Sequence, residues 1–349
     1  MAPSINDLVL YGQYVNKIGG IFFYGFFGVF GSLSIIIIFS SKKELRRTSS
    51  SQYILVAAIC DFIFLAIALG YRIMTDGFQV QGNIALFFFN PAVCRIRSYI
   101  TGVTNFATLY TKCLCTIDQW ASTSRSNKIR RFSSIKWAQL FLIINTFIWA
   151  LMQVPQLLYN DISTSSSGVM SCVSTSKGLT YAFAYFLLPV LYFFIPFIIL
   201  TIFGYLTYSH VKKLGQNSSN QGRFQRIERQ LTSLIIAQTL VCMVTSLPFG
   251  VQYLYTGITL TQTKDPYRLA LETFIQHVIR LNLYASSAAP FYVYVCLSNE
   301  IRRMAIELLF CKIIKMSKIA PSQIIDRTLD QTITIETHQM KSRNQTTMK

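Results

Sequence analysis

Residues Thr180–Tyr208 read TYAFAYFLLPVLYFFIPFIILTIFGYLTY and contain no Asp, Glu, Lys or Arg. A helix that crosses a lipid bilayer needs about 20 mostly apolar residues, so this stretch is long enough to span one. Helices are expected because lipid cannot satisfy free backbone groups, and the short alternating segments of a membrane β-barrel are absent. Six more apolar stretches have comparable length: Ile18–Phe39, Tyr53–Tyr71, Tyr99–Ile117, Trp137–Leu158, Leu231–Tyr255 and Leu269–Val295. The sequence therefore predicts an all-α membrane protein built as a seven-transmembrane-helix bundle.

The composition agrees with a membrane protein. Hydrophobic residues make up 52% of the 349 residues, charged residues make up 13%, and the mean hydropathy is +0.41. An ordinary soluble domain carries about 25% charged residues. One soluble core has no room for this much apolar surface, which excludes a cytosolic enzyme and a disordered chain.

The net charge of +18 is unevenly distributed along the chain. The connections after the first, third and fifth apolar stretches, together with the C-terminal tail, hold 23 of the 32 Lys and Arg residues. Basic connections stay on the cytosolic side of a membrane, so we expect an extracellular N-terminus, a cytosolic C-terminus and a place in the plasma membrane. No nucleic-acid partner is expected, because the cations are spread over four segments without stacking aromatics.

Four regions follow from this topology. Residues 1–17 are expected to form an extracellular N-terminus, and residues 18–297 the seven-helix domain. In residues 298–314, apolar side chains recur at helical spacing opposite two arginines, which predicts a short amphipathic helix on the cytosolic membrane surface. Residues 315–349 are polar and rich in threonine, which predicts a disordered cytosolic tail.

Two of the eight cysteines, Cys94 and Cys172, lie on the expected extracellular side. That side is oxidising, so we predict a disulfide between them; the alternative is a pair of unbridged thiols. Cys311 closes the amphipathic segment on the cytosolic side and is a candidate for palmitoylation, with an unmodified buried thiol as the alternative.

Two charged side chains fall inside expected membrane spans. Asp61 lies within the second stretch, where a carboxylate is costly and is a functional candidate by default; the alternative is a protonated structural Asp. Lys112 lies in the inner half of the third stretch. We expect it to pair with Asp61, Asp118 or a backbone carbonyl, and the alternative is a neutral lysine without a special role.

Several sequence markers occur together at the spacing of one known family. Asp118-Gln119-Trp120 follows Cys94 by 24 residues, and prolines interrupt the last three spans. The full set is Asp61, Cys94, Asp118, Trp149, Pro196, Pro248 and Pro290. With seven spans and an extracellular N-terminus, this set resembles a divergent rhodopsin-like (class A) G-protein-coupled receptor over residues 18–311.

The resemblance assigns roles to particular residues. It implies a sodium site at Asp61, with Thr108 and Ser286 beside it, and no other metal or cofactor. It also implies a signalling motif formed by Asp118, Gln119, Trp120, Glu228, Pro248, Pro290 and Tyr294. Gln119 replaces the arginine that the family usually has. Glutamine cannot donate the pair of charge-assisted hydrogen bonds that an arginine gives to a carboxylate. Both the contact that restrains the resting state and the coupling to a G protein are therefore in question.

The expected ligand is a peptide. The family's amine receptors use an Asp at the position of Thr101, and its retinal proteins use a Lys at the position of Leu283, so neither ligand class fits. The candidate ligand-binding residues at the extracellular end are Arg72, Arg97, Tyr99, Thr101, Gln252, Tyr253, His277 and Arg280. Three arginines suit a carboxylate or sulfate, and the surrounding aromatics and amides suit a peptide, as in neuropeptide receptors. Two alternatives stay open: the arginines contact lipid phosphates, or rim acids receive a basic peptide.

The sequence therefore predicts a G-protein-coupled receptor that converts binding of an extracellular ligand, a neuropeptide by preference, into cytosolic signalling. The expected partners are a peptide or other small ligand, a heterotrimeric G protein, membrane lipids and, through tail phosphorylation, an arrestin-like protein. The alternatives are a non-coupling or scavenging receptor and a membrane transporter or channel, although no internal repeat is visible. An intramembrane enzyme is disfavoured, because the three histidines are far apart in the sequence.

Overall fold

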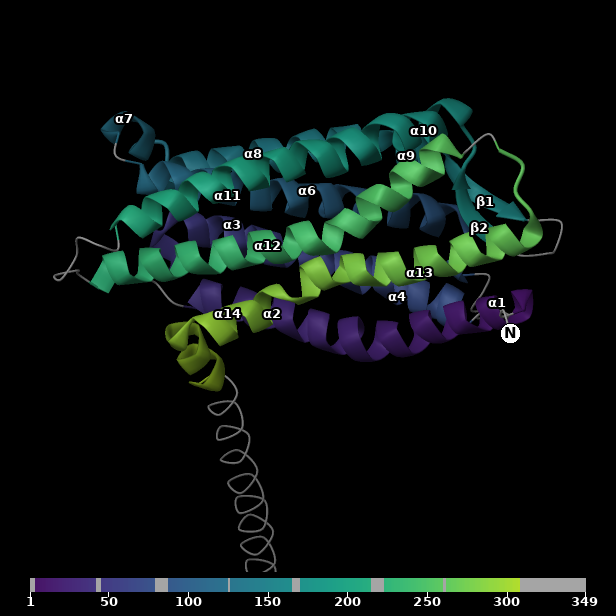
Figure 1. Cartoon of the computed structure of the whole chain (residues 1–349), viewed down its shortest axis with the longest axis horizontal. Helices are drawn as coiled ribbons and strands as arrows, with labels where there is room; N and C mark the ends of the chain where they lie inside the picture. The colour runs from purple at the N-terminus through teal and green to yellow at the C-terminus, as the bar shows by residue number, and fades with distance from the viewer. Residues whose placement is uncertain are drawn as a thin grey trace, which may run out of the picture. The chain divides into compact units, whose positions relative to one another are not determined.

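The computed structural model describes residues 4–41, 45–78, 87–124, 126–164, 170–214, 223–259 and 262–307, with the side chains of residues 23, 24, 213, 214 and 223–229 left out. Within these residues the chain forms seven long helical rods that run side by side (Figure 1). The first four rods are Ile5–Ser41 (α1 Ile5–Tyr14, η1 Val15–Phe26, α2 Phe27–Ser41), Ser49–Gly77 (α3 Ser49–Phe64, η3 Leu65–Leu69, α4 Gly70–Arg72, η4 Ile73–Gly77), α6 Pro91–Thr123, and α8 Ile135–Met152 with α9 Val154–Tyr159.

The remaining three rods follow a short hairpin. They are Lys177–Leu214 (α10 Lys177–Ala182, η5 Phe183–Phe194, α11 Ile195–Leu214), α12 Arg223–Ile258, and α13 Pro266–Ala288 with α14 Pro290–Leu297. The hairpin pairs β1 (Asn160–Thr164) with β2 (Met170–Ser174) in antiparallel register. Two single turns, η2 (Leu45–Arg47) and α7 (Asn127–Arg130), lie in the connections. Each of the seven predicted spans thus corresponds to one helical rod.

Side chains at the helix starts explain several of these boundaries. Asn90 accepts a hydrogen bond from the backbone N–H of Ala92 and precedes Pro91, so α6 begins with a polar cap and a residue that lacks an N–H. Asp265 caps α13 in the same way, ahead of Pro266. Each cap satisfies a backbone donor that the first helical turn leaves open.

The first rod begins at Ile5, well before the start at Ile18 that hydropathy predicts, so most of the expected N-terminal region is helical. A capping box at Ser4 starts this helix. Asn16 interrupts the apolar run in the sequence but fits inside the helix, because its side-chain amide donates to the carbonyl of Gly12 at 2.9 Å. The ammonium of Lys17 lies 4.6 Å from the ring centre of Phe78.

The bundle carries an apolar outer surface. Large hydrophobic side chains such as Phe147 and Val244 are 63% and 70% exposed. Five rods are long and apolar enough to cross a membrane: Ile5–Ser41, Ser49–Gly77, Ile135–Tyr159, Lys177–Lys212 and Gln230–Ile258. The other two, α6 and α13, each carry several charged side chains. An apolar surface of this extent fits lipid, and the protein is a multi-pass membrane protein.

A packed aromatic cluster holds α6 against α8. The rings of Phe106 and Trp149 stack with their centres 4.5 Å apart. Asn145 accepts a hydrogen bond from the indole of Trp149 and donates to the carbonyl of Ala107 on α6 at 3.0 Å. The cluster fixes α6, the long helix that carries Lys112, Asp118 and Gln119.

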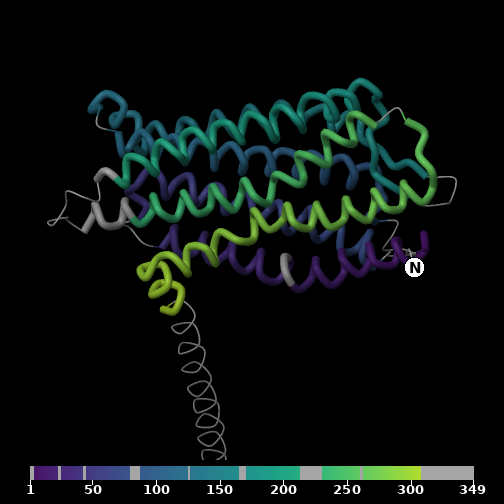
Figure 2. Tube along the Cα trace, in the orientation of Figure 1, coloured from purple at the N-terminus to yellow at the C-terminus, as the bar shows by residue number. Residues whose placement is uncertain are grey.

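The two ends of the bundle are distinct. The hairpin, the N-terminus and the connection between α12 and α13 lie at one end, which we call the disulfide end (Figure 2). The opposite end, where α6 carries Asp118 and Gln119, is called the Gln119 end. Residues 299–307 are helical and form a separate unit; they include the first part of the predicted amphipathic helix. Cys311 and the expected tail lie outside the described residues.

Candidate functional site: a polar axis through the bundle

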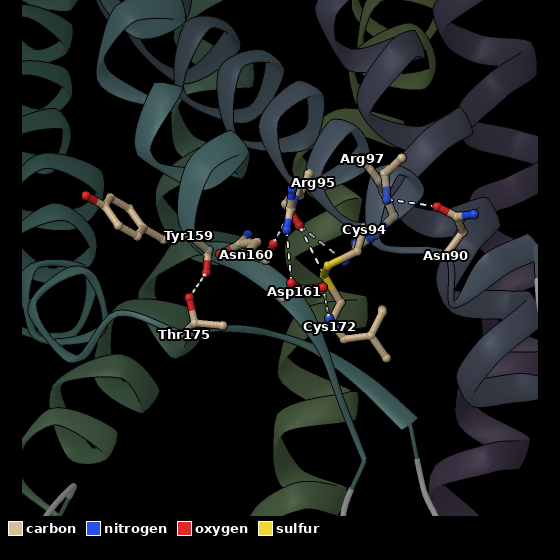
Figure 3. Close-up of a disulfide and its surroundings, with 12 residues drawn as sticks. Asn90, Cys94, Arg95, Arg97, Tyr159, Asn160, Asp161, Cys172 and Thr175 are labelled. Carbon is tan, nitrogen blue, oxygen red and sulfur yellow. Dashed lines mark hydrogen bonds and ion pairs between the residues drawn. A yellow bond between two sulfur atoms is a disulfide. The ribbon is translucent and has the colours of Figure 1, made fainter.

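A disulfide joins α6 to the hairpin. Cys94 lies in the first turn of α6 and is bonded to Cys172 on β2, with the two Cα atoms 5.8 Å apart (Figure 3). The predicted disulfide is therefore confirmed. It closes a sequence separation of 78 residues and holds β2 over the end of the bundle.

An ion pair that was not predicted from the sequence lies next to the disulfide. Arg95 donates to the carboxylate of Asp161 at 2.9 Å and to the carbonyl of Asn160 at 3.0 Å (Figure 3). The backbone N–H of Ile162 and the Arg95 guanidinium hold the pKa of Asp161 below its ordinary value. Arg95 directly follows Cys94 in the chain. A basic residue next to a cysteine of the predicted disulfide was the feature of the sequence that could have indicated this ion pair.

Behind the hairpin, the predicted ligand-binding arginines fall into small groups. Arg72 pairs with Asp76 at 3.1 Å and lies 3.4 Å from a ring nitrogen of His277. The guanidinium of Arg97 lies 4.0 Å from the ring centre of Tyr71. Arg280 is hydrogen-bonded to Tyr253. The structure thus brings Arg72 and His277 together, and Arg280 and Tyr253 together, while Tyr99 and Gln252 are half-buried on α6 and α12.

Two predicted ligand-binding side chains have unused polar atoms. Within the described part of the protein, the Nε atom of Arg97 and the hydroxyl of Thr101 are buried without a hydrogen-bond partner. Among the described residues, no carboxylate lies within 4.0 Å of the Arg97 or Arg280 guanidinium. Buried polar groups are normally paired, so these two atoms mark a place where water or another molecule is expected to supply the partner.

The rim acids expected to receive a basic ligand are occupied. Asp76 pairs with Arg72, and Asp265 caps α13. The carboxylate of Glu272 accepts from Lys264 at 2.5 Å and from Arg268 at 3.0 Å. The disulfide end therefore offers unpaired cations more readily than unpaired acids.

The middle of the bundle contains a buried ion pair. The ammonium of Lys112 lies 3.3 Å from Oδ2 of Asp61 and donates to the backbone carbonyl of Ser286 at 3.2 Å. Thr108 donates to Oδ1 of Asp61 at 3.0 Å. Of the predicted sodium-site residues, Asp61 and Thr108 are in contact, whereas Ser286 takes part only through its backbone carbonyl, which binds Lys112. The serine side chain that is hydrogen-bonded to Asp61 is that of Ser287, which the sequence did not single out.

At the Gln119 end, hydroxyl groups surround the acid of the predicted motif. Asp118 accepts hydrogen bonds from Ser49 at 2.7 Å and from Ser50 at 3.2 Å. The Gln119 amide N–H donates to Ser50, and its oxygen accepts from Thr232 on α12 at 2.5 Å. Gln119 therefore links α3, α6 and α12 by neutral hydrogen bonds.

The remaining signalling residues lie around this link. The ring of Trp120 packs edge-on against Phe203, with the centres 5.2 Å apart. Pro248 lies inside α12, and Pro290 begins α14. Tyr294 is buried and its hydroxyl donates to Gln238 of α12. The side chain of Glu228 lies outside the described residues.

Sequence comparison agrees with this arrangement. Residues 31–292 match the family described as "7 transmembrane receptor (rhodopsin family)". The chain is 22% identical to the somatostatin receptor type 2 of Mus musculus over 290 residues, which cover 79% of this chain and 72% of that receptor. It is 21% identical to the B2 bradykinin receptor of Homo sapiens over 225 residues, covering 63% and 57% of the two chains. A GQ-coupled rhodopsin of Mizuhopecten yessoensis is 22% identical over 209 residues, covering 58% and 40%.

The fold and the site define a seven-helix membrane receptor. They combine the seven helical rods, a disulfide from α6 to the hairpin, and a line of buried polar side chains along α6, namely Lys112, Asp118 and Gln119. The family match covers most of the chain, and the protein belongs to the rhodopsin family of seven-transmembrane receptors. The predicted family and the predicted G-protein-coupled receptor function are thus confirmed. Members of this family are receptors rather than enzymes.

Proposed function

We propose that this protein is a plasma-membrane receptor with an extracellular N-terminus, which converts binding of a peptide at the disulfide end into activation of a heterotrimeric G protein at the Gln119 end. The observation that carries the ligand class is the pair Arg97 and Arg280, which face no carboxylate among the described residues. A guanidinium is suited to a bidentate contact with a carboxylate. We therefore expect the peptide to present an acidic side chain or a C-terminal carboxylate.

The relatives support a peptide over a small amine. The somatostatin and bradykinin receptors take their names from peptides. In this chain the same end combines arginines with Tyr71, Tyr253 and His277, which offer flat apolar faces and hydrogen-bonding groups. A peptide has both apolar side chains and backbone amides to match these groups.

The signalling step is a shift between two states. A ligand that binds one state better than the other moves the population toward that state. The bond between Thr232 and Gln119 ties α12 to α6 at the Gln119 end. Outward movement of α12 breaks this bond and opens a cleft between Gln119, Gly204 and the foot of α12, where a G protein would bind.

The test is a G-protein activation assay in cells. The native chain and a Gln119→Arg variant are exposed to a neuropeptide library, and surface expression of each is measured. A peptide response of the native chain supports the proposed function. Silence of both chains at normal surface expression would count against a peptide ligand.

A second candidate function is a receptor that binds its ligand without coupling. The motivating observation is that Gln119 stands where the family has arginine, with both atoms of its amide group already hydrogen-bonded. In the same assay, this function predicts that only Gln119→Arg responds, while both chains bind labelled peptide. An arrestin-like partner at the tail and lipid attachment at Cys311 belong to the proposal as well, on segments outside the described residues.

A further inference from the structure

The pocket around Asp61 already contains a cation that belongs to the chain. The Nζ atom of Lys112 lies 3.3 Å from Oδ2 of Asp61 and 3.2 Å from the backbone oxygen of Ser286. Only 8% of the Lys112 side chain and 3% of the Asp61 side chain are exposed. The ammonium therefore lies where the resemblance to rhodopsin-like receptors places a sodium ion.

A sodium ion does not fit beside this ammonium. The charge of Asp61 is matched by Lys112, so a sodium ion at the same carboxylate would face a second positive charge at short range. Water screens that repulsion poorly in a buried site.

Lys112 also differs from a dissolved ion because it is attached to α6. The occupancy of a dissolved ion follows its concentration, whereas a tethered ammonium is always present. From α6 the ammonium reaches Asp61 on α3 and the Ser286 carbonyl on α13. One side chain thus joins three helices, and Thr108 holds the second oxygen of the carboxylate in place.

We propose that the Asp61 pocket is a cation site that Lys112 fills permanently, so that the receptor takes up no sodium there and its stability is independent of sodium. The pocket itself retains the carboxylate and hydroxyl groups that suit a small cation. Removing the ammonium therefore converts it into a site that takes sodium from solution. The pocket exists in the resting protein, so the test needs neither a ligand nor a G protein. If the test contradicts this inference about sodium, the proposed receptor function is not affected.

The test is thermal unfolding of the purified full chain in lipid nanodiscs. NaCl is raised while choline chloride is lowered, so that ionic strength stays constant. We expect the unfolding midpoint of the native chain to stay constant. The midpoint of Lys112→Leu should rise with sodium, by roughly 2 °C at a tenfold excess over the sodium Kd.

Two further variants serve as controls. Lys112→Leu combined with Asp61→Asn removes the carboxylate and should abolish the sodium response. Lys128→Leu removes an exposed lysine outside the pocket and should behave as the native chain. If Lys112→Leu does not fold, Lys112→Gln replaces it in the same series. A sodium-specific rise in the native chain would overturn the proposal, as would a folded Lys112 variant that ignores sodium.

Discussion

At the disulfide end, a covalent bridge and an ion pair join α6 to the hairpin, whereas at the Gln119 end hydroxyl groups that are hydrogen-bonded to Asp118 and to the Gln119 amide join α6 to α3 and α12. The bridge in the first set is a covalent bond, whereas every contact in the second set is a single hydrogen bond. A receptor needs this difference, because the ligand requires a preformed site while the signalling end has to change its contacts. Variants that alter one end and leave the other intact therefore separate the two sets of contacts.

The largest effect is expected from removal of the disulfide. Replacing Cys94 and Cys172 with alanine releases a constraint over 78 residues. The loop-entropy model assigns about 4 kcal/mol to a constraint of this length. We expect a large drop in the thermal midpoint and little protein at the cell surface. Cys60→Ala, which removes a half-buried thiol, is the matched control. Equal behaviour of the two variants would mean that the disulfide end is not held by its bridge.

Removing the arginines that face no carboxylate in the described part of the chain should weaken ligand binding. Arg280→Gln or Arg97→Gln deletes one charged donor at the disulfide end. A hydrogen bond to a charged group contributes about 1.5–3 kcal/mol, so peptide potency should fall by roughly 10-fold to 100-fold. The measurement is a dose–response curve with the peptide found by screening. Arg95→Gln serves as control, since Arg95 is engaged by Asp161. Unchanged potency in both arginine variants would argue against an acidic group on the ligand.

Loosening the Gln119 end should raise signalling in the absence of ligand. Thr232→Val removes the hydroxyl that Gln119 accepts from. One buried hydrogen bond contributes about 1 kcal/mol, which corresponds to roughly a fivefold change in the two-state ratio. Basal G-protein activity is the measurement for a coupling receptor. Thr207→Val is matched to it, because Thr207 is also buried but donates within its own helix, to Phe203. A larger basal increase in the control would show that the link to Gln119 does not restrain α12.

The smallest effect concerns pH at the hairpin. Because the pKa of Asp161 is lowered in the folded protein, its contribution to stability is present above the pKa of the unfolded chain. That contribution is lost as pH falls through the lowered folded-state pKa. We therefore expect Asp161→Asn to be slightly less stable than the native chain at neutral pH, and the gap to close under acid conditions. Thermal midpoints over a pH series measure this gap, and a gap that widens on acidification would contradict the assignment.

Hydropathy predicted the seven helical rods, although it placed the start of the first rod at Ile18 instead of Ile5. The disulfide was predictable because only two cysteines lie on the expected extracellular side. The neutral link at the Gln119 end was not predictable in the same way. Gln119 meets Ser50 and Thr232, which lie 69 and 113 residues away in the sequence. The residues around a serine or threonine do not show whether its hydroxyl binds Gln119 or a backbone carbonyl of its own helix.

The Lys112 pair was an intermediate case. A lone acid and a lone base inside apolar spans each require a partner, so the sequence narrowed the choices to Asp61, Asp118 or a carbonyl. It could not choose among them, because that depends on how far α3 and α6 are shifted along each other. The structure selects Asp61 together with the carbonyl of Ser286, while Asp118 is bonded to serine hydroxyls.

The early start of the first helix bears on how a ligand reaches its site. A helix of 37 residues is about 55 Å long, against a hydrocarbon layer of about 30 Å, so part of it stands beyond the membrane. Its α1 segment packs along α13, with Gly12 close to the ring of His277. This contact closes the space between the first and last rods at the level of Arg72, which lies beside His277. We expect ligands to arrive from the water above the hairpin rather than sideways through the lipid, which favours hydrophilic molecules over those that dissolve in membranes.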